Sequence, residues 1–108
     1  MTEAVFFEKD DLIVGFQILG HSSDSADDIE GKTVCAAVSS AAFMTANTMS
    51  EIIGVPLEAE VDDAVMKIGI TSGADKCRVL LRGFKLHLTE LAKEYPNRLK
   101  ISTLNSEV

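Results

Sequence analysis

The sequence predicts an α+β protein, a two-layer sandwich in which a mixed or antiparallel sheet of about five strands is covered by two helices. Short runs of branched and aromatic residues come in pairs separated by polar turns, and two longer stretches follow helical rules. These patterns alternate in the order ββαββαβ. The length of 108 residues suits one such domain, which we place over residues 1–108.

The first two predicted strands, residues 4–8 and 12–19, flank the polar Lys9-Asp10-Asp11 and predict a hairpin. In the second strand, the two-residue period places one set of side chains on the face that should pack against the helices. These are Leu12, Val14, Phe16 and Ile18. Residues 20–33 then lose all periodicity and predict a long loop.

Residues 34–53 predict the first helix, with Thr33 as its N-cap and Gly54 as its end. This stretch carries a single charge, Glu51, in twenty positions, so it lacks an ordinary solvated face. We therefore expect it to be buried on most sides by the sheet, the second helix or another subunit.

A second hairpin is predicted over residues 57–61 and 64–71. The second helix should begin at a capping box formed by Ser72 and Asp75 and should end before Pro96. Its apolar positions recur at spacings of three and four, and we expect Cys77 and His87 to pack in the core. Residues 98–104 predict the last strand.

The formal charge of −7 disfavours nucleic acid and anionic membranes as ligands. The first residues do not show the basic segment followed by an apolar one that is typical of a secretion signal, so we expect a cytoplasmic protein. The two cysteines are then expected to be reduced thiols. Their spacing fits no metal-ligand pattern, so a metal site is not expected.

Two residues indicate a specific chemistry. Cys35 is the second residue of the predicted helix, where free amides and the helix dipole favour a thiolate. His21 lies fourteen residues upstream, where a strand should meet the loop. Together they fit a nucleophile and its base. The alternatives are a small packed cysteine and an exposed loop histidine without a role.

The residues around this pair resemble the paired signature of the ribosomal-processing cysteine proteases, the Prp family. Gly20-His21 is followed by Val34-Cys35-Ala36-Ala37-Val38-Ser39. The likeness extends over the opening hairpin, a helix of small residues containing Asn47, and Tyr95-Pro96 before a basic strand.

This resemblance implies an α+β fold, a homodimer, and removal of a short N-terminal extension from a large-subunit ribosomal protein. It implies that Cys35 is the nucleophile and His21 the general base, with no cofactor. Because the family's substrates carry adjacent aromatic residues at the cleavage point, it also implies an apolar groove near the loop.

The sequence departs from the family at Lys32-Thr33-Val34, where many relatives have Asp-Ile-Val before the cysteine. Asp27 and Asp28 are candidates to orient His21 instead, and a Cys/His dyad is the other option. Ser22 and Ser39 are candidates for substrate contact.

The missing acidic residue before the cysteine also motivates an alternative function, a non-hydrolytic ribosome-associated binding or assembly factor with the same fold. A dimeric scaffold is a third reading.

Overall fold

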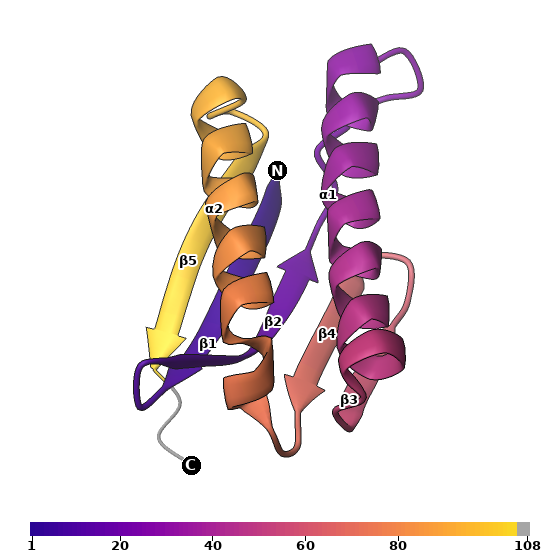
Figure 1. Cartoon of the computed structure of the whole chain (residues 1–108). Coiled ribbons are helices and arrows are strands. Elements are labelled where there is room, and N and C mark those ends of the chain that lie inside the picture. Colours follow the sequence, from indigo (N-terminus) through magenta and orange to yellow (C-terminus); the bar gives the residue numbers. More distant parts are fainter. Residues whose placement is uncertain (106–108) are drawn as a thin grey trace.

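Five strands form one sheet, and two helices cover one of its faces (Figure 1). The computed structural model describes residues 1–105, so positions 106–108 of the predicted domain lie outside the described residues. The strands are β1 (Thr2–Lys9), β2 (Leu12–Leu19), β3 (Leu57–Val61), β4 (Val65–Ile70) and β5 (Leu99–Asn105), and the helices are α1 (Ile29–Asn47) and α2 (Arg78–Glu94). The predicted fold class and element order are confirmed.

The sheet is mixed, with the strand order β3-β4-β2-β1-β5. Neighbouring strands are antiparallel except β1 and β5, which run parallel and pair Thr2 with Leu99. This pairing brings the beginning of the chain beside the residues that precede β5. Both strands therefore reach the same end of the sheet as the loop that leaves β2.

The β1–β2 hairpin contains an irregularity that shifts the predicted face of β2. Asp10 and Asp11 both have positive φ, 53° and 65°, as a tight hairpin turn requires. Phe7 pairs with Gly15 and Glu8 with Ile13, so Val14 is the extra residue of a bulge. The prediction that Leu12 and Val14 face the helices is therefore wrong: Ile13 joins the core instead.

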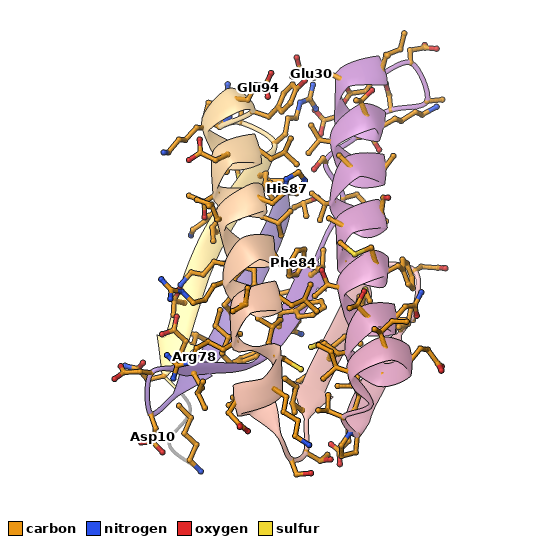
Figure 2. All side chains as sticks on the ribbon, viewed as in Figure 1. Asp10, Glu30, Arg78, Phe84, His87 and Glu94 are labelled. Atoms are coloured by element: carbon orange, nitrogen blue, oxygen red, sulfur yellow. The ribbon has the colours of Figure 1, made fainter. Side chains whose placement is uncertain are left out.

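Aromatic rings from the sheet and from α2 form the centre of the core. Phe84 lies between the two helices (Figure 2), with its ring centroid 5.5 Å from that of Phe6 and 4.9 Å from that of Phe16. All three side chains are at most 5% exposed. The tilted and edge-on arrangements are those that aromatic pairs prefer, so this cluster joins α2 to β1 and β2.

Helix α1 begins five residues earlier than the sequence predicted. Asp28, not Thr33, is its N-cap, because the Asp28 carboxylate accepts a hydrogen bond of 3.0 Å from the Gly31 amide. The loop after β2 is correspondingly shorter and spans residues 20–28. At its other end α1 widens into a π-helical turn, Thr48–Ile53, and stops at Gly54 as predicted.

The nearly uncharged α1 is only partly covered. Its inner side chains, such as Val34 and Val38, are buried under the sheet and α2, whereas Phe43 and Met44 are 47% and 56% exposed. Within the described chain, none of the helices is both long and apolar enough to cross a membrane.

The start of α2 also differs from the prediction. A short 3-10 turn, Ala74–Cys77, precedes it, and Gly73 caps this turn without a side-chain hydrogen bond, so the Ser72–Asp75 capping box is wrong. Cys77 is buried in the core as predicted, and burial raises the pKa of its thiol. His87 is exposed, so its predicted place in the core is wrong.

Candidate active site

A pocket of about 220 Å³ opens where α1, the end of β2 and the β3–β4 turn meet. Both residues of the predicted pair line it, together with a largely apolar wall. The wall is formed by Ile18, Val38, Ala42, Phe43, Val61, Val65 and Met66. An apolar cavity therefore lies beside the loop, where the family resemblance implied a groove.

Cys35 lies in the second turn of α1, six residues after its first residue, Ile29. The prediction that Cys35 stands at a helix start is therefore wrong, and amides at this depth are bonded within the helix. A different donor reaches the sulfur: the backbone amide of Ser22 donates to Cys35 Sγ at 3.1 Å. The loop after β2, rather than the helix terminus, supplies a hydrogen bond to the thiol.

Ser22 is held by its remaining polar atoms. Its hydroxyl donates to the Arg98 carbonyl at 2.9 Å, and Thr2 Oγ1 lies 2.6 Å from the same hydroxyl oxygen. Its carbonyl accepts from Arg98 Nη1 at 2.8 Å. With 1% exposure, the side chain faces inward. The predicted substrate contact by the Ser22 hydroxyl therefore does not fit this structure, because that group is already engaged inside the protein.

The close approach of the loop to α1 requires glycine at position 31. A Cβ built on Gly31 would lie 2.5 Å from the Ser22 carbonyl oxygen, the Ser23 Cα and Asp28 Oδ2. Contacts of this length are far below ordinary van der Waals separation. The missing side chain allows the segment carrying His21 and Ser22 to pack directly on the first turn of the helix.

Asp28 joins the helix N-cap to an ion pair. Arg98 Nη2 donates to Asp28 Oδ1 at 2.9 Å and Arg98 Nη1 donates to Oδ2, while the amides of Asp24 and Gly31 donate to the same carboxylate. Those two amides, followed by Arg98, hold the pKa of Asp28 below its ordinary value. The carboxylate in turn raises the pKa of Arg98.

These contacts leave Asp28 poorly suited to the predicted role of orienting His21, because both of its oxygens are engaged elsewhere. Asp27 is exposed, and its carbonyl accepts from the Ile29 amide. Two other carboxylates, Asp62 and Asp63 of the β3–β4 turn, line the pocket with His21. In the sequence they lie between the two strands of the second predicted hairpin.

The pocket brings His21, Cys35 and Ser39 together, with Ser39 one helical turn after the cysteine. His21 is exposed at the rim, whereas Cys35 is half-buried. Both cysteines are free thiols. Among the described residues, no three His, Cys, Asp or Glu side chains are grouped to hold a metal ion. The side chains present can supply a nucleophile and a base from the protein itself.

Sequence reasoning missed Thr2 and Arg98, which reach the site from the two ends of the chain. Thr2 lines the pocket, and Arg98 contacts Ser22 and Asp28. Their proximity depends on the parallel pairing of β1 with β5. A single sequence contains no local signal for such a pairing.

The chain is similar to a known protein family and to several solved structures. The family model described as cysteine protease Prp matches residues 1–100. The crystal structure of SMU.848 from Streptococcus mutans is 26% identical, with a TM-score of 0.85, over 98% of this chain and 99% of that one. None of the proteins of curated function matches.

Two further similar structures are of an essential ribosomal-processing protease, Prp, from Staphylococcus aureus. One, in complex with a covalently linked product peptide, is 18% identical with a TM-score of 0.82. The other, in complex with a substrate peptide, is 16% identical with a TM-score of 0.84. Each match covers 96% of this chain and 100% of the other, and shows that the fold is shared.

Proposed function

The chain belongs to the Prp family of cysteine proteases, and from this premise we propose that it removes the N-terminal extension of a large-subunit ribosomal protein, with Cys35 as nucleophile and His21 as general base. The observation that carries the assignment is the shared pocket. Cys35 and His21 both line it, and a backbone amide donates to the Cys35 sulfur. Such a cysteine and histidine together perform acyl transfer without a cofactor.

The reaction then proceeds in two halves. His21 takes the proton of the Cys35 thiol, and the sulfur attacks the scissile carbonyl carbon to give a tetrahedral oxyanion. Collapse of this species breaks the C–N bond, and His21 returns the proton to the leaving amine. Water, deprotonated by His21, next attacks the thioester, releases the new carboxylate and restores the thiol.

The pocket supports a preference for an apolar segment before the cleaved bond. Its apolar wall, which includes Phe43 and Val61, lies beside the nucleophile. Ser39 is the pocket hydroxyl one turn from Cys35, so we assign it to substrate contact. The related S. aureus enzyme has been crystallised with a substrate peptide and with a covalently linked product peptide, which supports the same reaction class here.

The partner is therefore a ribosomal precursor protein in the cytoplasm, not a nucleic acid. A formal charge of −7 repels a phosphate backbone and suits the basic tails typical of ribosomal proteins.

A homodimer is supported by α1, whose exposed Phe43 and Met44 belong to a helix almost free of charge. Sedimentation of wild type and Met44→Lys tests this part, because a dimer built on this face should dissociate in the variant.

The experiment that tests the proteolytic function is mass-spectrometric detection of cleavage. The substrate is a ribosomal protein with an N-terminal extension containing paired aromatic residues. Cys35→Ala should abolish cleavage, and His21→Ala should slow it by about 10²- to 10⁴-fold. Cys77→Ala is the matched control, because this buried thiol lies in the core away from the pocket. Binding of the substrate without cleavage by the folded wild type would instead support the non-hydrolytic assembly factor.

A further inference from the structure

Arg98 connects the loop after β2 and the start of α1 to the beginning of β1, which is distant from them in sequence. Its guanidinium contacts the loop after β2 through the Ser22 carbonyl and the start of α1 through Asp28. Its own carbonyl, at the start of β5, accepts from the Ser22 hydroxyl and from the Thr2 amide at 2.9 Å each. One residue thus anchors the loop to both the sheet and the helix that carries Cys35.

The charges around Arg98 are arranged to keep its side chain in place. Asp28 holds it with two hydrogen bonds, and Asp24 and Glu30 lie 3.5 and 3.3 Å away on either side. Glu30 stands at the end of α1 that faces the end of α2 marked by Glu94 (Figure 2). The Arg98 side chain is 21% exposed and that of Asp28 is 11% exposed, so this pair is shielded far more than a surface ion pair.

The anchored residue, Ser22, leaves one polar group for the nucleophile. Its carbonyl and hydroxyl are both bonded to Arg98, and Thr2 contacts the hydroxyl from the other side. The remaining group is the amide, which points at Cys35 Sγ. The amide and the carbonyl of Ser22 belong to successive rigid peptide units that meet at its Cα. Anchoring the carbonyl and the side chain holds this Cα in place and so limits the rotation that could turn the N–H away from the sulfur.

We infer that Arg98 is a positioning residue of the active site: it clamps Ser22 so that the Ser22 amide is held against the Cys35 sulfur, with His21 next to it in the chain. This inference rests on the proposed function. It assigns Arg98 no contact with substrate. Its effect passes through the amide, since a donor held at the sulfur favours the thiolate that attacks the substrate.

The test compares Arg98→Met with Arg82→Met. Both substitutions remove one arginine and keep side-chain bulk, but Arg82 is an exposed residue of α2 outside the pocket. Two readouts are followed: the pH profile of Cys35 alkylation by iodoacetamide, located by peptide mapping, and steady-state cleavage. The alkylation readout needs no substrate, so it remains informative even if the proposed substrate is wrong.

For Arg98→Met we expect the alkylation rate at neutral pH to fall about tenfold, because the sulfur loses the amide donor that favours its reactive form. We expect kcat to fall about 100-fold and KM to change by less than about threefold, because the Ser22 amide and the adjacent His21 lose their fixed position while the apolar wall is intact. Arg98→Lys should restore part of the alkylation rate and part of kcat, since lysine keeps the charge but not the bidentate contact with Asp28. Arg82→Met should leave all values unchanged.

Ser22→Ala is a second variant, in case Arg98→Met folds poorly. It removes the hydroxyl anchors but leaves the amide, and it should also lower the alkylation rate of Cys35. An alkylation profile like that of the wild type in folded Arg98→Met and Ser22→Ala would overturn the positioning role, even if both proteins unfold at lower temperature. Shifted alkylation together with no cleavage by the wild type would refute the proposed substrate and leave the role of Arg98 standing.

Discussion

Gly31→Ala is the substitution that most directly tests how the loop and α1 form the site. Alanine normally stabilises a helix relative to glycine, by about 1 kcal/mol in a helix interior. At Gly31 the added methyl group would collide with the Ser22 carbonyl and with Ser23, each 2.5 Å away. Gly83, in α2, is the matched control, because no described atom would lie within 4 Å of a Cβ there.

The two variants should therefore change stability in opposite directions. Gly83→Ala should raise the free energy of unfolding by about 1 kcal/mol, which corresponds to roughly 4–8 °C in Tm. Gly31→Ala gains at most the same stabilisation from helix propensity. Overpacking of the added methyl group against the loop backbone should lower its free energy of unfolding by about 1–3 kcal/mol. The difference between the variants should thus be about 1–3 kcal/mol, with Gly31→Ala the less stable.

Urea unfolding followed by circular dichroism measures this difference, and cleavage of the precursor peptide measures the effect on the site. If the loop retreats by about 1 Å, the Ser22 amide leaves the Cys35 sulfur, and kcat should fall about 100-fold. Gly83→Ala should cleave at the wild-type rate. Equal stabilisation by both substitutions, with cleavage unimpaired in Gly31→Ala, would refute the idea that this glycine is needed for the loop to approach the helix.

Three further outcomes are expected. Because the pKa of Asp28 is lowered in the folded state, its contribution to stability is complete above the ordinary carboxyl range and is lost as pH falls through the lowered pKa. Urea unfolding of wild type and Asp28→Asn should therefore converge on acidification from about pH 7 to pH 2; a constant gap would contradict this. Iodoacetamide should label Cys35 in the native protein and Cys77 only after unfolding, as peptide mapping would show; native labelling of Cys77 would contradict its burial. Phe84→Ala should lower the free energy of unfolding by about 3–5 kcal/mol in the same urea assay, because both aromatic partners lose their contact; a loss below about 1 kcal/mol would disprove the central place of this ring.

The strands, the helices and their order were predictable because each depends on local pattern. The hairpins were marked by two or three polar residues between apolar runs, and α2 by a clear stripe of apolar positions. At the start of α1, where the prediction failed, a contact from a distant part of the chain accompanies the difference. The start of α1 moved to Ile29 because Asp28 caps it while also binding Arg98, an arrangement that Thr33 cannot provide.

In the candidate site, too, the residues were predictable from the sequence but their contacts were not. Cys35 and His21 were identified from their residue types and from the family signature around them. The reason first given for the reactivity of Cys35, a place at a helix terminus, was wrong because α1 begins earlier. The donor found in its place, the Ser22 amide, belongs to a segment thirteen residues away, and no property of the sequence indicates which way that amide points.

The parallel pairing of the first strand with the last also bears on when the enzyme becomes active. The proposed nucleophile and base, Cys35 and His21, are synthesised early, yet the clamp on Ser22 needs Arg98 and Thr2, which meet only when β5 adds to the edge of the sheet. A nascent chain that has not yet released β5 from the ribosome would hold Cys35 and His21 without the contacts that align them. With the roles proposed for these residues, the site is aligned only after β5 has been synthesised and has joined the sheet.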